Sequence, residues 1–91
     1  MRRLVTIDLT AADIAAFGAY EATVLPLLAR QGGRLEARVR ALDGSSETHL
    51  LFFPDAQAFE AYRSDPARLA APDQWAACGA VAIVTEVETI G

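Results

Sequence analysis

The sequence predicts an α+β fold in which a four-stranded antiparallel sheet carries both of its helices on one face. Three observations support this fold class. Strand-like and helix-like segments follow one another in the order β-α-β-β-α-β, turn residues separate them, and no linker or repeat interrupts them. Two right-handed βαβ crossovers in this order interlock into one sheet, which is the ferredoxin-like arrangement. The 91 residues suit one small domain, so a single domain over residues 1–91 is expected.

Local sequence marks the first strand and the start of the first helix. Residues 3–9 alternate and are rich in Val, Ile and Leu, which predicts a strand. Thr10 is the expected N-cap of the helix, with Asp13 in its first turn as a weaker form of the capping box. The helix is expected to continue to Arg30 or Gln31.

Pro26 and the pair Gly32-Gly33 shape the end of this helix. Pro26 has no amide hydrogen to donate to the carbonyl of Ala22, so the helix is expected to bend or restart there. A glycine can adopt the left-handed cap conformation without steric cost, so Gly32-Gly33 predicts the stop.

The first helix carries a carboxylate among its core-facing residues. Glu21 lies near the middle of an apolar stripe that covers roughly 100° of the helix surface. A buried carboxylate has a buried partner, has taken up a proton or faces a cavity, and the sequence leaves these three alternatives open. The stripe consists of Ile14, Phe17, Val24, Leu25 and Leu28.

Two strands joined by a turn follow the glycine pair. Residues 34–42 alternate strictly, residues 43–46 begin with Asp-Gly and predict a turn, and residues 47–53 predict the returning strand. One face of the first of these strands carries Leu35, Ala37, Val39 and Ala41, and the other carries Glu36, Arg38 and Arg40.

A second helix is predicted directly after this pair of strands. Pro54 ends the returning strand, and Asp55 is the expected N-cap of a helix over residues 56–63. Phe59 and Tyr62 are expected to face inward.

The end of the chain predicts a short helical turn and a final strand. Asp65-Pro66 restarts a helix over residues 67–71, as N-cap and first helical residue. A loosely patterned stretch with Trp75 and Cys78 follows. Residues 80–90, rich in Val, Ile and Thr, predict the last strand.

One face of the predicted sheet is left without helices. If the turn over residues 43–46 has two or four residues, Arg38 and Arg40 share this open face with His49; three or five residues with a bulge would move His49 to the helix side. A face exposed to solvent rarely carries as many large apolar residues as this one. A second copy of the sheet is therefore expected to cover the open face. The other residues expected on the open face are Thr6, Asp8, Leu51, Phe53, Val84, Glu86 and Glu88.

Composition argues against several classes of function. A net charge of −4 disfavours nucleic acid and anionic membrane surfaces as partners. Cys78 is the only cysteine and His49 the only histidine, so neither a disulfide nor a structural zinc site is expected. No Gly-rich phosphate loop and no metal-binding motif is present, so no cofactor and no metal is expected.

Hydrophobicity and the N-terminus bear on assembly and location. The hydrophobic fraction of 53% is high for a chain of this length, which again favours a homodimer. No signal peptide or transmembrane stretch is recognised, so the cytoplasm is the expected location.

The βαββαβ order and two blocks of residues resemble an uncharacterised bacterial family of the dimeric α/β-barrel superfamily, known only as a domain of unknown function. The first block is Tyr20-Glu21, Pro26-Leu27-Leu28 and Gly32-Gly33, and the second is Phe53-Pro54, Ala61-Tyr62 and Ser64-Asp65-Pro66. The resemblance covers nearly the whole chain. It implies a dimer whose two sheets pack face to face into a barrel, with a cleft between each sheet and its own helices.

The same superfamily includes cofactor-free monooxygenases of antibiotic biosynthesis and muconolactone isomerase-like enzymes. No catalytic motif of theirs aligns with this chain residue by residue, so these activities are analogies at the level of the fold.

Three residues are candidates for chemistry. Glu21 is the first, as a general acid or base in a helix–sheet cleft, since burial would raise its pKa toward neutrality; the alternative is a structural carboxylate. Tyr62 could hydrogen-bond to it. His49 could carry a proton near neutral pH, although a polar interface residue beside Arg38 or Arg40 is favoured.

Two functions follow from the sequence. The first is a cytoplasmic homodimer that binds a small hydrophobic metabolite and transforms it as a cofactor-independent, monooxygenase-like or isomerase-like enzyme. The second is a non-catalytic ligand-binding or interaction module of the same fold, in which Glu21 is structural. An enclosed cavity that holds the Glu21 carboxyl group favours the first.

Overall fold

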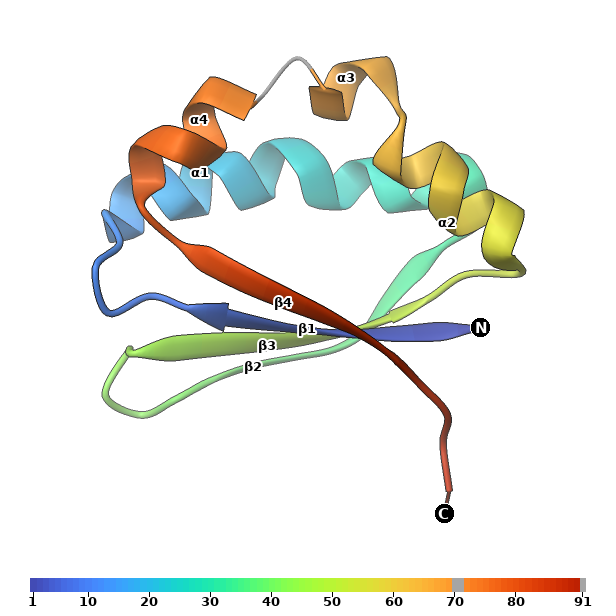
Figure 1. The fold of residues 1–91 in the computed structure, drawn as a ribbon, viewed down its shortest axis with the longest axis horizontal. Coiled ribbons are helices and arrows are strands. Elements are labelled where there is room, and N and C mark those ends of the chain that lie inside the picture. The colour runs from blue at the N-terminus through green and yellow to red at the C-terminus, as the bar shows by residue number, and fades with distance from the viewer. Residues whose placement is uncertain (70–71, 91) are drawn as a thin grey trace.

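The computed structural model describes residues 1–69 and 72–90, which form one sheet with helices above it (Figure 1). The chain runs through β1 (Arg2–Asp8), α1 (Ile14–Val24), the 3-10 helix η1 (Leu25–Gln31), β2 (Arg34–Arg40), β3 (Ser46–Phe52), α2 (Ala56–Arg63), α3 (Pro66–Leu69), α4 (Pro72–Cys78) and β4 (Val81–Val87). No helix in these ranges is both long and apolar enough to cross a bilayer.

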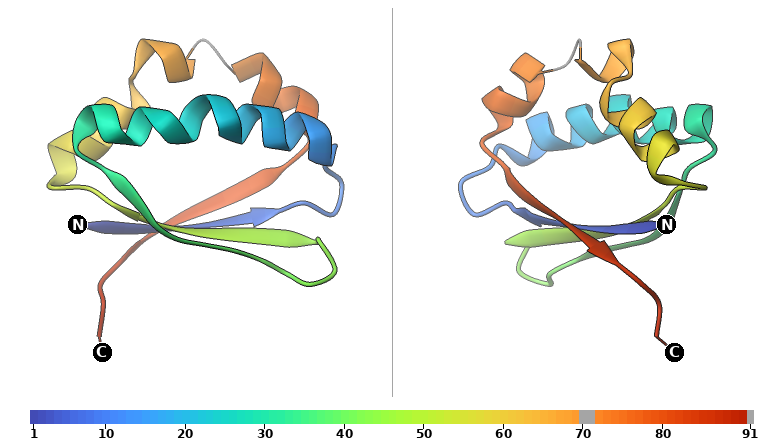
Figure 2. Two further views of the ribbon diagram at one scale, coloured as in Figure 1. Left: turned by 180° about the vertical axis from the view of Figure 1, so that it is seen from behind. Right: turned by 45° about the vertical axis from the view of Figure 1, so that its right-hand side comes forward.

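The four strands form a sheet in the order β2-β3-β1-β4, and every neighbouring pair is antiparallel. The two crossovers through helices place all helices on the same side of this sheet, as the two views in Figure 2 show. The predicted ferredoxin-like α+β fold is confirmed.

The first helix begins later than Thr10, because Asp13 is its N-cap. The Asp13 carboxylate accepts a hydrogen bond of 3.0 Å from the amide of Ala16. Both the amide and the hydroxyl of Thr10 donate instead to the carboxylate of Asp8, at 2.9 and 2.8 Å. The predicted capping box is therefore wrong, since the turn after β1 uses the side chain expected to cap the helix.

The helix changes type where Pro26 interrupts its hydrogen bonding. The α-helical turns end at Val24, and η1 continues in the same direction to Gln31 (Figure 2). Gly32 then adopts the left-handed conformation, with a φ of 72°, which confirms the predicted stop.

The stretch around Trp75 and Cys78 forms a helix, α4, that the sequence pattern did not reveal. The Tyr20 and Trp75 rings pack with their centroids 5.0 Å apart, which joins α4 to α1. Cys78 is buried, as expected. The helical turn predicted over residues 67–71 corresponds to α3, while residues 70 and 71 lie outside the described part of the chain.

The core lies between the helices and the sheet. Phe17 and Phe53 have no exposed surface, and Ile7 has 2%. The predicted stripe of α1 and η1 buries Phe17, Val24 and Leu28, whereas Ile14, at the first turn, is 47% exposed.

The sheet face that carries His49, Leu51 and Phe53 lies beneath the helices, so its predicted exposure to a second sheet is wrong. Arg38 pairs with His49, and Arg40 pairs with Glu47. The amide of Ala41 bonds to the carbonyl of Ser46 and closes a loop of residues 42–45. The expected sharing of one face by Arg38, Arg40 and His49 is therefore confirmed.

Val84 and Glu86 were expected on the open face but also lie on the helix side, opposite Val5 and Arg3 of β1. Alternation divides a strand into two faces without saying which face the helices cover. The open face instead carries Thr6 and Asp8, as expected, together with Leu4, Val39, Leu50, Phe52 and Ile83. Glu88 lies beyond the end of β4.

Gly79 joins α4 to β4 in a conformation that requires glycine. Its φ is 76°, and an added Cβ would lie 2.8 Å from the carbonyl oxygen of Ala11. We expect Gly79→Ala to lower the free energy of unfolding by about 2 kcal/mol or more, because the left-handed backbone alone costs about 1–2 kcal/mol. Chemical denaturation measures the change.

Gly18→Ala is the matched control. Gly18 is exposed within α1, and an added Cβ would meet nothing within 4 Å. Alanine should stabilise the helix there by about 0.5–1 kcal/mol. Equal effects of the two substitutions would contradict the proposed strain at Gly79.

Candidate functional site

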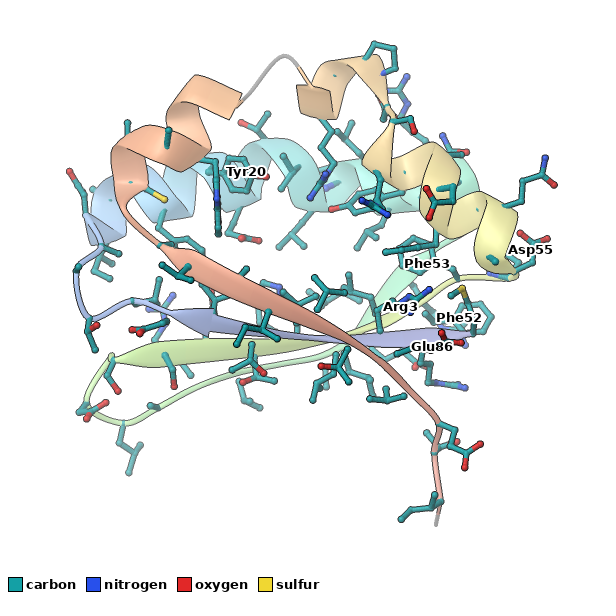
Figure 3. The ribbon with its side chains drawn as sticks, viewed as in Figure 1. Arg3, Tyr20, Phe52, Phe53, Asp55 and Glu86 are labelled. Carbon is teal, nitrogen blue, oxygen red and sulfur yellow. The ribbon has the colours of Figure 1, made fainter. Side chains whose placement is uncertain are left out.

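A cavity of about 410 Å³ lies between the helices and the sheet. Ala82 and Val84 line it and are also exposed, so the cavity opens to solvent beside β4. Figure 3 shows Tyr20 on α1, beside α4. The complete lining is Val5, Ile7, Tyr20, Glu21, Val24, Leu25, His49, Leu51, Phe59, Tyr62, Arg63, Arg68, Trp75, Ala82 and Val84.

Glu21 contributes a carboxyl group to this apolar cavity from the middle of α1. Only 5% of the residue is exposed, and no side chain or amide in the described residues forms a hydrogen bond with it. Burial raises its pKa to about 7; the charge of Arg38 opposes this shift, and that of Glu47 adds to it. Of the three alternatives left open by the sequence, the carboxyl group therefore faces a cavity and binds a proton readily.

His49 extends from β3 toward Glu21. Its Nδ1 lies 4.0 Å from a carboxylate oxygen of Glu21, and its Nε2 lies 3.4 Å from one of Glu47 without the alignment of a hydrogen bond. Burial lowers the pKa of His49, although the charge of Glu47 acts in the opposite direction. The imidazole is therefore neutral at neutral pH.

Glu47 is the site residue that the sequence analysis missed. It is 2% exposed and accepts a hydrogen bond of 2.8 Å from Nε of Arg38, with Nη2 of Arg40 at 3.3 Å. Burial opposes its ionisation, but the hydrogen bond from Arg38 and the charges of Arg38, His49 and Arg40 outweigh burial and lower its pKa. The four-residue loop of the β2–β3 hairpin places Arg40 opposite Glu47, and a four-residue turn in the sequence could have indicated this pair.

These side chains form a polar row from the cavity to the edge of the sheet. It runs from Glu21 through His49 and Glu47 to Arg38 and Arg40, whose side chains are 38% and 47% exposed. Its two carboxyl groups have oppositely shifted pKa values, so Glu47 stays charged while Glu21 can donate or accept a proton near neutral pH.

Tyr62 faces the same cavity from α2 and is 5% exposed. Within the described residues no hydrogen bond joins its hydroxyl to Glu21, so the expected contact is not formed. Burial raises its pKa, and Arg68, whose guanidinium carbon lies 5.0 Å from the ring centroid, opposes this shift. The three candidate residues Glu21, His49 and Tyr62 thus surround one cavity, and their catalytic roles stay a prediction.

Among the side chains that the structure describes, no group of three or more His, Cys, Asp or Glu is arranged to hold a metal ion. The polar groups at the cavity are suited to acid–base chemistry and to hydrogen bonding with a ligand.

The raised pKa of Glu21 makes a prediction about stability. A carboxyl group whose pKa rises from 4.5 to about 7 binds protons more tightly in the folded chain, so stability falls as pH rises through this window. The full effect is about 3 kcal/mol, at 1.36 kcal/mol per pKa unit. Between about pH 5 and pH 8, we expect the free energy of unfolding of Glu21→Gln to rise by about 2 kcal/mol relative to that of the wild type.

Urea denaturation at the two pH values measures this difference. Glu60→Gln, a substitution of an exposed carboxylate on α2, is the control and should follow the wild-type pH dependence. If the stability of Glu21→Gln also had the pH dependence of the wild type, Glu21 would have an ordinary pKa.

Comparisons with known proteins identify the fold. No protein-family model matches the sequence, and no curated protein sequence matches it, so the expected domain-of-unknown-function family receives no support. SnoaB, a cofactor-independent oxygenase from Streptomyces nogalater, has a similar structure, with a TM-score of 0.74 and 17% identity over 98% of this chain and 93% of that chain.

Two further solved structures have the same architecture. A putative antibiotic biosynthesis monooxygenase from Nitrosomonas europaea has a TM-score of 0.69 and 13% identity, covering 96% of this chain and 98% of its own. A dimeric ferredoxin-like protein of unknown function from Jannaschia sp. has a TM-score of 0.66 and 18% identity, covering 96% and 100%. At these identities the likeness shows the ferredoxin-like fold alone.

Proposed function

We propose that the protein binds a small, largely apolar molecule in the cavity and that Glu21 exchanges a proton with it. One observation supports this most directly: a carboxyl group with a pKa of about 7 faces an apolar space of about 410 Å³ without a hydrogen bond from the described residues. A ligand that brings a hydroxyl or an acidic C–H group to Glu21 would supply the missing partner.

The proposed chemistry is general acid–base catalysis without a metal or an organic cofactor. In an isomerase-like reaction, the Glu21 carboxylate removes a proton from a carbon next to a carbonyl group, and the resulting acid returns it to another position. A monooxygenase-like reaction would begin with the same proton removal and would need molecular oxygen as oxidant. The likeness to SnoaB, described as a cofactor-independent oxygenase, makes this second class worth testing.

The proton step can be tested with β-tetralone, an apolar ketone with acidic C–H groups. We expect the wild-type protein to accelerate exchange of these hydrogens in deuterium oxide, followed by NMR. Glu21→Gln should reduce the protein-dependent rate by about 100-fold, within the usual contribution of a general base. Binding of β-tetralone without faster exchange would leave the non-catalytic ligand-binding function.

A pair of variants at Ala82 checks that the reaction occurs in the cavity. Ala82 is an exposed residue of the lining, so Ala82→Trp should obstruct the cavity without disturbing the core, whereas Ala82→Ser should have little effect. Undiminished exchange in Ala82→Trp would place the reaction elsewhere.

We also propose that two copies of the chain associate through their open sheet faces. Val39 on β2 is 62% exposed there, and Val81 and Ile83 on β4, at the opposite edge of the sheet, are 63% and 66% exposed. Covering this surface with a second, identical sheet would remove it from water. The similar structure from Jannaschia sp., which is described as dimeric, supports this proposal.

Solution mass at micromolar concentration tests the dimer. We expect the wild type to be a dimer and Ile83→Lys to be largely monomeric, because the charge would be buried at the interface. Leu42→Lys, in the exposed loop of residues 42–45, is the control and should remain dimeric. A monomeric wild type would overturn the proposed interface.

A further inference from the structure

We propose that the molecule bound in the cavity carries an acidic group, a carboxylate on an aromatic ring system, and that Arg68 binds this group. The proposal rests on the proposed function, because it takes the cavity to be a ligand site. It adds the charge and shape of the ligand and a residue that the sequence analysis did not single out.

Arg68 differs from the other arginines in its partners. The chain has eight basic residues, all arginines, and seven of them lie within ion-pair distance of a carboxylate: Arg2, Arg3, Arg30, Arg34, Arg38, Arg40 and Arg63. No carboxylate that the structure describes lies within that distance of Arg68. Its Nε is buried and has no hydrogen-bond partner among the described residues.

The cavity also carries one positive charge that no described carboxylate pairs with, in a chain that is negative overall. The whole chain has a net charge of −4. The ionisable lining consists of Arg63, Arg68, Glu21, His49, Tyr20 and Tyr62, and of these His49 and the two tyrosines are neutral at neutral pH. The charge of Arg63 is compensated by Glu60 at 3.2 Å, whereas Arg68 has no ion-pair partner among the described residues and the one carboxyl group of the lining is only partly ionised. This balance favours an anionic ligand.

Arg68 is held where it can reach such a ligand. It extends from α3, its guanidinium carbon lies 5.0 Å from the centroid of the Tyr62 ring, and it lines the cavity. Packing against an aromatic ring orients a guanidinium group, and the Nε–H of Arg68 has no hydrogen-bond partner among the described residues. The planar fork of donors fits a carboxylate, to which it can form two parallel hydrogen bonds.

The aromatic part of the proposal comes from the rest of the lining. Tyr20, Phe59, Tyr62 and Trp75 place aromatic rings around the cavity, and Val5, Leu25, Leu51 and Val84 add aliphatic surface. Flat ring systems pack well against such walls. An aromatic carboxylate therefore matches the apolar body and the charged end of the site.

Binding of β-naphthoic acid and of β-naphthamide tests the proposal, because the two probes share a shape and differ in charge. At about pH 6 and low salt, where the acid is ionised and Glu21 is mostly protonated, we expect the acid to bind wild-type protein about tenfold or more tightly than the amide. Arg68→Gln should weaken binding of the acid by about 10- to 100-fold and change binding of the amide by less than about threefold. Titration calorimetry measures both.

Two further variants separate charge at Arg68 from other causes. Arg68→Lys should keep part of the preference for the acid, since the charge remains. Arg63→Gln is the matched control: Arg63 lines the same cavity but is paired with Glu60 at 3.2 Å, so its loss should leave the preference intact.

The outcomes distinguish this inference from the proposed function. Equal binding of acid and amide by the wild type, equal loss of both probes in Arg68→Gln, or loss of the preference in Arg63→Gln would each overturn the role of Arg68 while leaving the cavity a ligand site. Binding of neither probe to the wild type, together with no binding of β-tetralone, would overturn the proposed function itself.

Discussion

The pairing of Glu47 with Arg38 and Arg40 is the interaction on which the site depends. A buried carboxylate is costly unless charged partners and hydrogen bonds compensate it. Here two arginines from the neighbouring strand do so, while their own side chains remain about half exposed at the edge of the sheet. Because Glu47 is satisfied in this way, polar residues can lie beneath the helices without opening the core to water.

This arrangement affects His49, which lies next to Glu47, and Glu21, which lies next to His49. His49 is neutral and lies between the two carboxyl groups, and Glu21 beyond it receives no hydrogen bond from the described residues. Glu47 is held charged by its arginines, whereas burial holds Glu21 near the point where it is half protonated at neutral pH. Two carboxyl groups on one polar row therefore have different chemistry, set by their surroundings rather than by their type.

The fold and the cavity give different information about the function of the protein. Structural likeness to SnoaB and to ferredoxin-like proteins of unknown function identifies the architecture and no reaction, because one fold supports many sites. The function has to be inferred from Glu21, Arg68 and the apolar walls around them. These residues come from α1, α3, α2, α4 and the sheet, so the site exists only when all the layers are assembled.

The sequence by itself determined the order of the predicted strands and main helices, the antiparallel sheet and the stop at Gly32, and it reduced the face shared by Arg38, Arg40 and His49 to the length of one turn, which the structure decided. Each of these depends on backbone conformation, on residues a few positions apart or on the parity of a hairpin. Glu21 was also recognisable, since a carboxylate in an apolar stripe is visible in the helical repeat.

Only the tertiary structure decided which face of the sheet the helices cover, and with it the burial of Glu47 and His49. It likewise decided that Tyr62 faces Arg68 rather than Glu21, and that α4 closes over Tyr20 through Trp75. The physical reason is that alternation along a strand specifies two faces without distinguishing them. Burial, and with it the pKa of each buried group, is set by side chains that arrive from distant parts of the chain.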